Sequence, residues 1–577
     1  MSMDYEQLIK ALNEERNVAF ISKDYSSFAA PILLAAGRSV EMIISFPDTF
    51  PLTPPLFLIP NLDEFRVHVD PKGKICLFDK TSVLFDVEHP EQILIDCFDQ
   101  AVDILNTPVQ SKTFLREMTR EFNAYWSYYA DNCIDWACDT PQQKYYKTSA
   151  LWINNRLILA NSVDDARYLA CNYMKCTVNG SETTIPCTIV SLRNGSAPIW
   201  IKKEYQWNEV RRYILNNTSS SARRAFKTFL SNKIAGKKRY MFILICPTEY
   251  GNLIFGFNIQ FDGFRNETIE HCRSTKLSPI FVRRMDRDHL LIRGGGNPNI
   301  LSNKKVLLLG CGSVGGFIAA NLCQMGIGTI DLLDNDHFSI ENVHRHFLGF
   351  DSAFNENTGK ADLLKARLEQ MYPYVDIDAL NYSDRSAEHF IQDVERMKCY
   401  DIVISALGEP TINLALNRLF VENNVHLPFV VCFNEPYGIG GHIVAVNIDR
   451  ESCLQCLYTK IDDSEMCAYR ASLVAPGQFF KKNLSGCSGA FVPYSVLDSQ
   501  QTAILASRVV SRILQGTESR SFAEYWTGDG SDLKNAGFIT SPLFDEKNGK
   551  SAVNRIEHFG NLHCPICRKR KEGTLIK

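Results

Sequence analysis

One segment of the chain constrains its fold more than any other. The apolar run KKVLLL, residues 304–309, leads directly into GCGSVGG (Gly310–Gly316), and the segment GFIAANLCQMG then has the composition of a buried helix. A glycine-rich turn between a strand and a helix lets the backbone approach a phosphate, and the helix N-terminus supplies unpaired amides and partial positive charge. The segment therefore predicts a Rossmann-like nucleotide site.

The residues after this turn separate the possible nucleotide chemistries. The second strand ends at Asp334, about 24 residues after Gly310, where an acid can accept hydrogen bonds from a ribose. Asn342, Arg345 and Lys360 follow in DNDHFSIENVHRHFLG and GKAD. Attack on an α-phosphate needs such cations and amides, because negative charge grows there in the transition state. This favours adenylation with ATP; a nicotinamide-type domain, a structural turn and a solvated charged loop remain the alternatives.

The chain predicts three domains of the α/β and α+β classes. Residues 1–140 contain a strand (VEMIISFP), a proline-rich turn and helices near residues 90–105 and 114–129. Residues 141–280, a connecting domain of unknown role, mix strands (TTIPCTIVSL, RYMFILIC, LIFGFNI) with a helix near residues 207–215 and an expected loop, NNTSSSARR. Residues 281–577 alternate strand and helix, which predicts a mostly parallel sheet covered by helices.

Composition and charge narrow the classes of function. The 577 residues carry a net charge of −3, which gives no overall attraction to nucleic acid or anionic lipid. Apolar runs such as Tyr240–Cys246 are shorter than the roughly 20 residues that span a bilayer, and MSMDYEQLIK lacks a signal-peptide pattern. We expect a cytoplasmic protein without membrane or direct nucleic-acid partners.

The cysteine usage points to chemistry as well as packing. In a reducing compartment the 19 cysteines are expected to be core residues, metal ligands or nucleophiles rather than disulfides. Four lie in apolar runs and are expected in the core: Cys97, Cys246, Cys323 and Cys432. Two CxxC pairs, Cys453 with Cys456 and Cys564 with Cys567, can supply four thiolates to a tetrahedral Zn²⁺. Two unrelated turns are the alternative; a four-thiolate site would be structural, because no ligand position is open.

Residues from about 283 to 567 resemble the adenylating domain of ubiquitin-activating enzymes and of the bacterial molybdopterin and thiamine pathway activators. The resemblance implies that the acid holds the ribose and that the amide and cations act around the phosphates. Widely spaced CxxC pairs also occur in that family, where the metal is structural. The matching nucleotide-site residues are Gly310, Gly312, Gly315, Asp334, Asn342, Arg345 and Lys360.

Two further features of this family bear on assembly and on Mg²⁺. RMDRDHLLIRGG (284–295) resembles the family's opening helix, which implies that Arg287 reaches into the site of a partner protomer in a homodimer. The family usually has an aspartate for Mg²⁺ after the fourth strand, but this chain has Gly408 and Glu409 there. The Mg²⁺ ligand is therefore left open, with Glu409 as a candidate.

Cys487 is the expected first nucleophile. It lies in NLSGCSGAFVPYS, a Gly/Ser loop with Lys481 and Lys482 nearby, and a free thiol needs such a cation or a helix N-terminus to become a thiolate at neutral pH. The family carries its acyl-accepting cysteine in a loop that crosses the active site, and Cys487 matches that position best. Cys467 is the second candidate, and a structural role for Cys487 is the alternative.

The N-terminal region resembles a ubiquitin-conjugating domain. FPDTFPLTPPLFLI (46–59) is similar to that family's strand and proline-rich turn, and HVDPKGKICLF (68–78) is similar to the segment that ends in its catalytic cysteine, here Cys76. The family usually reads His-Pro-Asn where this chain has His68, Val69 and Asp70. What replaces the asparagine is left open, and an inactive variant is the alternative.

Together the resemblances imply a thioester relay. A protein's C-terminal carboxylate would be joined to AMP, pass to Cys487 and then to Cys76, and end on an amine of a target. This layout is similar to bacterial fusions in CBASS anti-phage operons, which implies that the carrier is a cyclic-nucleotide synthase (CD-NTase). Two other classes remain: an adenylyltransferase for a sulfur-carrier or ubiquitin-like protein without conjugation, and a nicotinamide oxidoreductase or nucleotide-bound scaffold.

Overall fold

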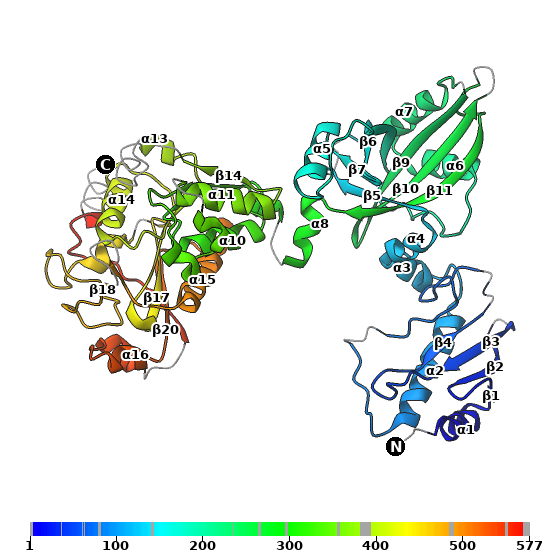
Figure 1. The fold of residues 1–577 in the computed structure, drawn as a ribbon, viewed down its shortest axis with the longest axis horizontal. Helices are drawn as coiled ribbons and strands as arrows, with labels where there is room; N and C mark the ends of the chain where they lie inside the picture. The colour runs from blue at the N-terminus through cyan, green and yellow to red at the C-terminus, as the bar shows by residue number, and fades with distance from the viewer. Residues whose placement is uncertain are drawn as a thin grey trace. The chain divides into compact units, whose positions relative to one another are not determined.

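The computed structural model divides the chain into two compact units, Met1–Asp286 and Arg287–Lys577. No helix among the described residues is both long and apolar enough to cross a membrane. Figure 1 shows both units. The structure describes residues 4–568 except 36, 61, 63, 79–81, 140–142, 235, 264–266, 295–297, 355–357, 381–393, 450, 484–489 and 548–551.

The first unit begins with a small antiparallel sheet packed on two helices. Helix α1 starts after Asp4, whose carboxylate accepts a hydrogen bond from the backbone N–H of Gln7. Apolar residues of the sheet and both helices form one core, which includes Cys97 as predicted. The elements are α1 (Tyr5–Arg16), β1 (Ile21–Ser22), β2 (Ser27–Leu33), β3 (Ser39–Ser45), β4 (Leu56–Leu58) and α2 (Pro90–Asn106).

The predicted helix at 114–129 forms as two helices, α3 (Lys112–Arg120) and α4 (Phe122–Tyr129). Ser111 caps α3 by accepting a hydrogen bond from the N–H of Phe114. Phe122 and Trp126 of α4 are fully buried against aromatic residues of the following domain. Because the helix breaks at Glu121, α3 and α4 can each direct their apolar residues into the core.

The middle of the chain folds into a closed barrel with the strand order β10-β11-β5-β7-β6-β8-β9. Alternate residues such as Ile243 and Ile245 fill its interior, as the two-residue period of a strand requires. The barrel takes strands from outside residues 141–280 at both ends. Its strands are β5 (Asn132–Ala137), β6 (Tyr145–Ile153), β7 (Arg156–Ala160), β8 (Thr183–Ser191), β9 (Gly236–Thr248), β10 (Gly251–Gly263) and β11 (Arg273–Arg284).

Three helices cover the outside of the barrel: α5 (Val163–Asn172), α6 (Trp207–Asn217) and α7 (Ser220–Leu230). The expectation of a loop over NNTSSSARR (216–224) is wrong, because α7 already begins at Ser220. Ser219 caps it by accepting a hydrogen bond from the N–H of Ala222, so the serine run starts a helix rather than a loop. Phe226 and Phe229 then bury its apolar face.

The second unit is built on an eight-stranded sheet in the order β14-β13-β12-β15-β16-β17-β20-β21. Strands β14 to β16 are parallel, and the remaining pairs are antiparallel. The sheet becomes antiparallel at β17 because the connection from β16 is too short for a crossover. Its strands are β12 (Lys305–Leu309), β13 (Thr329–Leu333), β14 (Asp376–Ala379), β15 (Ile402–Ser405), β16 (Phe429–Asn434), β17 (Gly440–Val446), β20 (Phe522–Thr527) and β21 (Ala552–Glu557).

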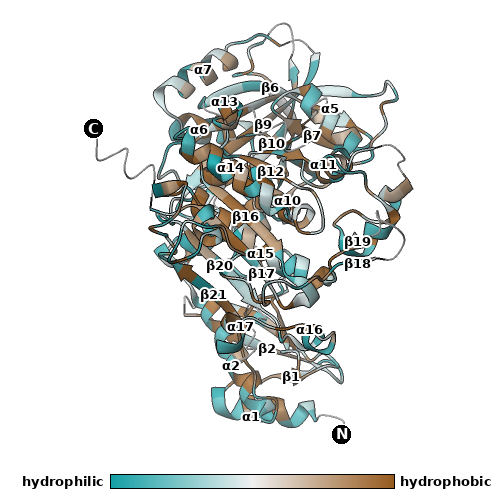
Figure 2. Cartoon of the chain, turned by 90° about the vertical axis from the view of Figure 1, so that its left-hand side faces the viewer, coloured by the Kyte–Doolittle hydropathy of each residue, from teal (hydrophilic) through white to brown (hydrophobic). Residues whose placement is uncertain are grey.

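Helices cover both faces of this sheet. Val306 and Leu308 of β12 pack into the core with α10 (Gly315–Gln324), α11 (Lys360–Met371) and α15 (Val496–Leu514), whereas Leu307 and Leu309 face α14 (Pro410–Glu422). Figure 2 shows the apolar colour of β16 in this sheet. Cys323 and Cys432 lie in the first core and Cys246 lies in the barrel unit, so the predicted core cysteines are buried.

Short elements connect these parts of the second unit. They are α8 (Arg287–Leu291), η1 (Ile292–Gly294), α9 (Pro298–Leu301), η2 (Ile340–Arg345), η3 (Phe350–Phe354), α13 (Val394–Met397), η4 (Pro436–Gly438), η5 (Leu454–Tyr458), β18 (Lys482–Asn483), β19 (Ala490–Phe491), α16 (Ser531–Asn535) and α17 (Pro542–Glu546).

Candidate nucleotide, zinc and thiol sites

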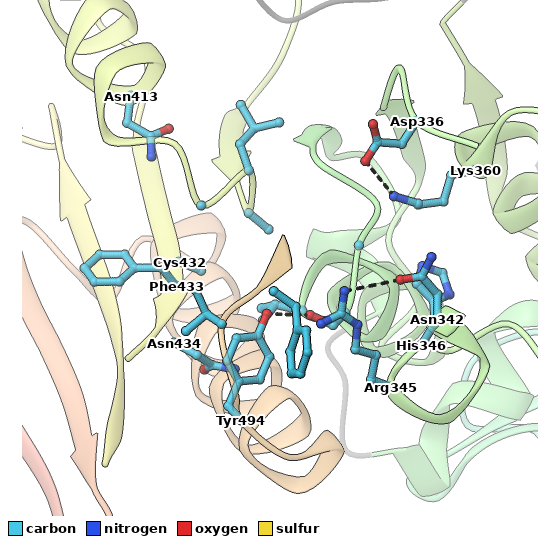
Figure 3. A pocket seen from close by; sticks show the side chains of 18 of the residues that line it. Asp336, Asn342, Arg345, His346, Lys360, Asn413, Cys432, Phe433, Asn434 and Tyr494 are labelled. Carbon is cyan, nitrogen blue, oxygen red and sulfur yellow. Dashed lines mark hydrogen bonds and ion pairs between the residues drawn. The ribbon is translucent and has the colours of Figure 1, made fainter. Parts of the chain in front are cut away.

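A pocket of about 510 Å³ lies at the carboxyl ends of the parallel strands in the second unit. Strand β12 runs into the glycine turn, β13 into Asp334, and β15 into Ala406, and ligands of open α/β sheets bind at this edge. Figure 3 shows the side chains that converge there. The pocket is lined by residues that include Gly312, Ser313, Asp336, Asn342, Arg345, His346, Lys360, Gly408, Asn434, Phe491 and Tyr494.

Each predicted glycine of the turn has a different reason to lack a side chain. Gly310 has a φ of 88°, which L-residues rarely adopt, and a Cβ on Gly315 would lie 1.9 Å from the carbonyl oxygen of Gly310. A Cβ on Gly312 would meet no atom within 4 Å. Gly310 and Gly315 thus shape the turn, whereas Gly312 leaves open space in the pocket that a phosphate can occupy.

Asp334 is held at the end of β13 by the glycine turn and by Lys360. Its Oδ2 accepts a hydrogen bond from the N–H of Cys311 at 2.6 Å, and its Oδ1 lies 3.9 Å from the Lys360 Nζ. Burial raises the pKa of the Asp334 carboxyl, and the nearby Lys360 cation opposes that shift. Lys360 is itself buried and also donates a hydrogen bond to Asp336 at 3.0 Å.

Asn342 and Arg345 lie together on η2, as the sequence predicts for an amide and a cation around phosphates. Arg345 donates a hydrogen bond to the Oδ1 of Asn342 at 3.4 Å, and Asn342 donates one to the Ser339 hydroxyl at 2.7 Å. Figure 3 shows Arg345 and Lys360 on the same side of the pocket. Two cations in a pocket lined largely by polar groups are suited to binding a polyphosphate.

His346 is a pocket residue that the sequence reasoning missed. Its Nε2–H donates a hydrogen bond to the carbonyl of Cys311 at 2.6 Å, and its Nδ1 accepts one from the N–H of Leu348 at 3.0 Å. Burial lowers the pKa of this imidazole to about 4, so it is neutral near pH 7. A neutral His346 therefore fixes the glycine turn to η2; its position next to Arg345 is the only sequence signal for it.

Two further pocket residues, Tyr494 and Asn434, come from distant parts of the chain. The Tyr494 hydroxyl lies 3.1 Å from the Ser313 hydroxyl of the glycine turn. Asn434, at the end of β16, accepts a hydrogen bond from Thr502, but its buried Nδ2 has no hydrogen-bond partner among the described residues. A buried donor left unpaired in a polar pocket is suited to a ligand acceptor. Open space at Gly312, two cations and this donor together fit a bound nucleotide.

The acids near this pocket bear on the open question of Mg²⁺. Gly408 lines the pocket with a φ of 70°, whereas Glu409 is exposed before α14 and is not among the residues that line it. Among the described lining residues Asp336 is the acid. Oxygen ligands suit Mg²⁺, so Asp336 fits the pocket better than Glu409 as a Mg²⁺ ligand.

Arg287 stands at the start of α8, within the second unit. Its guanidinium donates hydrogen bonds to the carbonyl oxygens of Gly326 and Ile327 at 2.6 and 2.8 Å. These carbonyls follow the C-terminal end of α10. In a single chain Arg287 is thus held beside α10, and its reach into a partner protomer stays a prediction.

The two CxxC pairs come together although they are far apart in the sequence. The Sγ atoms of Cys453 and Cys564 lie 3.7 Å apart, and those of Cys456 and Cys567 lie 3.4 Å apart. All four sulfurs lie within 4.8 Å of one another and are buried. A tetrahedral site with Zn–S bonds of about 2.3 Å has sulfurs about 3.8 Å apart, so these four fit Zn²⁺.

Cys487 falls at residues 484–489, outside the described residues. The described strands on either side, β18 and β19, pair with each other, and Phe491 of β19 lines the nucleotide pocket. Lys482 of β18 lies over the Tyr437 ring, 5.0 Å from its centroid. Cys467, the second candidate, is half-buried.

Cys76 is exposed and lines a pocket of about 490 Å³ in the first unit. Its N–H donates a hydrogen bond to the carbonyl of His68 at 2.7 Å. Gly73 closes the turn between them with a φ of 84°, and a Cβ there would lie 1.9 Å from the Ile59 carbonyl oxygen. Asp70 accepts hydrogen bonds from the N–H groups of Lys72 and Lys74, so its carboxylate stabilises this turn.

Two protein families match the chain. The ThiF family matches residues 288–529, and prokaryotic E2 family B matches residues 16–134. These matches define the class: the chain joins a ThiF-type adenylation domain to a ubiquitin-conjugating-like domain, and it is an ATP-dependent, ubiquitin-activating and ubiquitin-conjugating-like transferase. The fold class and the fusion predicted from the sequence are thereby confirmed.

The same combination connects the chain to named relatives. It is similar to "ATP-dependent ubiquitin transferase-like protein Cap2" of Escherichia coli, with 21% identity over 95% of this chain and 93% of that one. The protein of that name from Pseudomonas aeruginosa is 22% identical over 78% of this chain and 80% of its own. The one from Vibrio cholerae is 28% identical over 45% of this chain and 44% of its own, less than half its length.

Solved structures of E. coli MccB also match the chain. The structure with ATP has a TM-score of 0.33 and 17% identity, and the match covers 47% of this chain and 68% of that one.

Proposed function

We propose that this chain joins a protein's C-terminal carboxylate to AMP, relays the acyl group through Cys487 to Cys76, and transfers it to an amine. The observation that carries the proposal is the nucleotide pocket, where the glycine turn, Asp334, Arg345 and Lys360 meet at one sheet edge. The exposed Cys76 in a pocket of the conjugating-like domain supports the final transfer.

The adenylation step assigns a role to each pocket residue. A carboxylate oxygen attacks the α-phosphorus, a P–O bond breaks, and pyrophosphate leaves. Arg345 and Lys360 stabilise the negative charge that develops on the phosphates, and Asp334 accepts hydrogen bonds from the ribose. Asp336 would ligate Mg²⁺, which neutralises phosphate charge when bound.

The thiol steps conserve the energy of the adenylate. The Cys487 thiolate attacks the acyl carbon and AMP leaves; Cys76 then takes the acyl group by thioester exchange, and an amine attacks it there. The strands that flank 484–489 support attack at the nucleotide pocket, because Phe491 of β19 lines that pocket.

The carrier and the assembly follow from the resemblance to Cap2 proteins and to the CBASS fusions. We propose a CD-NTase cyclic-nucleotide synthase as the protein whose C-terminus is activated. We also propose a homodimer in which Arg287 completes the site of the partner protomer. Zn²⁺ at Cys453, Cys456, Cys564 and Cys567 holds the C-terminal segment to the sheet and has a structural role. Metal analysis of purified protein should find about one zinc per chain, and the Cys564→Ser variant should lose it.

Intact-mass analysis tests the relay. The chain is incubated with ATP and the CD-NTase-type protein encoded next to it, and the adduct is challenged with a thiol. Wild type should carry a thiol-sensitive adduct, Cys76→Ala should keep it on Cys487, and Cys487→Ala should carry none. A Cys487→Ala chain that still acylates Cys76 would contradict the order of the relay.

Activation without conjugation is the second candidate function. It predicts that Cys76→Ala supports acyl transfer to the final acceptor as well as wild type. A point substitution is needed for this comparison, because Trp126 of α4 is buried in the core shared with the barrel and a deletion of residues 1–140 would remove β5. Loss of product with an intact Cys487 adduct favours the relay.

A further inference from the structure

Three titratable side chains meet at the pocket of Cys76: His68 and Glu121 line it, and Glu117 adjoins His68. The conjugating-domain motif did not predict the two glutamates. The Nε2 of His68 lies 3.8 Å from the Oε2 of Glu117, and its Nδ1 lies 3.6 Å from the Oε2 of Glu121. All three side chains are half-buried. They come from the turn before Cys76, from α3 and from the break between α3 and α4, so the fold rather than the motif assembles them.

Tyr125 and Glu121 hold the backbone of His68 in place. Its φ of 59° lies in the left-handed region, and its N–H donates a hydrogen bond to the Tyr125 hydroxyl at 2.7 Å. That hydroxyl donates in turn to the Oε2 of Glu121 at 2.8 Å. Tyr125 is 4% exposed, and burial raises the pKa of its phenol, which keeps the donated proton in place. The carbonyl of His68 accepts the hydrogen bond from Cys76, so one chain of contacts joins α4 to the thiol.

The surroundings leave His68 accessible to a molecule that enters the pocket. Its side chain is 26% exposed and lines the same cavity of about 490 Å³ as Cys76. The other charged groups near it are Asp70 and Lys74, which line the cavity, and Arg120, which lies 3.9 Å from Glu117. The cavity is otherwise mainly apolar, which restricts water around an acyl group on Cys76.

We propose that the imidazole of His68 is the base that accepts the proton of the incoming amine. The amine nitrogen attacks the thioester carbon on Cys76, the C–N bond forms, the C–S bond breaks, and the amine proton passes to the unprotonated ring nitrogen of His68. Cys76 leaves as a thiolate. Glu117 and Glu121 flank the two ring nitrogens at 3.8 and 3.6 Å and so orient the ring in the pocket. Tyr125 is a positioning residue that sets the His68 backbone. The inference rests on the proposed function in one respect: Cys76 must carry the acyl group.

A two-stage experiment on the full chain separates the inference from the proposed function. The protein is charged with ATP, Mg²⁺ and the neighbouring CD-NTase-type protein, charging is stopped with EDTA, and free lysine is added as the amine. Loading of Cys76 and its discharge are followed by intact mass. His68→Asn is the main variant, because asparagine tolerates a positive φ but cannot accept the proton. The matched control is His89→Asn, an exposed histidine of the same domain outside the pocket.

The inference expects His68→Asn to load Cys76 as wild type does but to discharge it about 100-fold more slowly. The wild-type-to-variant ratio of discharge rates should fall from pH 8 to pH 5, because a protonated imidazole accepts no proton. His89→Asn should match wild type in both stages. Tyr125→Phe, which loses the hydrogen bonds but keeps the ring, should slow discharge less and retain the pH dependence.

Several outcomes would overturn the inference. Equal discharge by His68→Asn and wild type, or a rate ratio that is constant with pH, removes His68 as the base. Loss of wild-type discharge in EDTA would assign His68, Glu117 and Glu121 to a divalent cation instead. A wild-type chain that never loads Cys76 refutes the proposed relay itself, and with it this step. If His68→Asn loads poorly, the Glu121→Gln variant decides, and its unchanged discharge would also count against the proposal.

Discussion

The two pockets of this chain are built in different ways. The nucleotide pocket lies at the ends of adjacent parallel strands and holds a buried cation, Lys360, against Asp334, whose side chain is 8% exposed. The Cys76 pocket is formed by turns and by helix α4 around an exposed thiol. The first site therefore has its charges arranged in a buried ion pair, whereas the second depends on hydrogen bonds across a surface turn. Substitutions should consequently cost more in the first than in the second.

The largest effect is expected from Lys360→Met. Removing the cation should lower ATP–pyrophosphate exchange by about 10²- to 10³-fold, because Lys360 opposes negative charge both on the phosphates and on Asp334. Lys365→Met is the matched control, since Lys365 lies on the same helix and pairs with the exposed Asp378. If both variants exchange pyrophosphate at similar rates, the Lys360 cation is not needed to stabilise phosphate charge in this pocket.

The glycine turn should respond to methyl groups according to position. Gly315→Ala places a Cβ 1.9 Å from the Gly310 carbonyl oxygen and should lower the free energy of unfolding by about 3 kcal/mol. Gly312→Ala meets no protein atom and should change it by less than about 0.5 kcal/mol, while raising the KM for ATP. Urea denaturation and exchange kinetics check both. An unchanged KM in Gly312→Ala would mean that the space at Gly312 is not where the nucleotide binds.

Acid should weaken the unit that contains the nucleotide pocket. The pKa of His346 is about 4 in the folded chain, below the ordinary value of 6.5, so the unfolded state binds the proton first. Its stabilising contribution is present above about pH 6.5 and falls by about 2 kcal/mol between pH 7 and pH 5.

Urea midpoints at the two pH values test this expectation. His346→Gln should lose that part of the pH dependence, whereas His344→Gln, at an exposed neighbouring position, should keep it. Equal pH dependence in wild type and His346→Gln would show that His346 is not the group that makes unfolding depend on pH.

The smallest effect is expected from Asp70→Asn in the Cys76 pocket. Asparagine keeps an acceptor for the N–H groups of Lys72 and Lys74, so unfolding should change by less than about 1 kcal/mol. Loading of Cys76, followed by intact mass, should stay within about twofold of wild type. A tenfold loss of Cys76 loading would show that Asp70 has a chemical role in this pocket. Substitutions in the two pockets would then differ less in their effects than expected.

The sequence predicted those parts of the sites whose residues are close in the chain or follow strands directly. The glycine turn, Asp334 and the order of strands and helices around them follow from periodicity and local spacing. Cys453 with Cys456, and Cys564 with Cys567, could be recognised as ligand pairs because a CxxC pattern supplies two thiolates from one turn. The residues in each of these patterns are close in the sequence, and they are also close in the folded chain.

Other parts depend on contacts that no local pattern records. The role of His346 follows from a hydrogen bond to Cys311, and Asn434 and Tyr494 reach the pocket from other strands and loops. Glu121 approaches His68 only because α4 packs on the barrel. The serine run before α7 was wrongly predicted to be a loop, because serine is common both in loops and at helix N-caps. Only the apolar residues that follow indicate that a helix begins there.

The most direct test of the central claim is ATP–pyrophosphate exchange in the presence of the neighbouring CD-NTase-type protein. The account predicts that labelled pyrophosphate enters ATP only with that protein present, persists in Cys487→Ala and Cys76→Ala, and stops when the protein's C-terminal carboxylate is amidated. Exchange that is absent from the wild-type chain, or that continues with the amidated protein, would contradict adenylation of a C-terminus in this pocket.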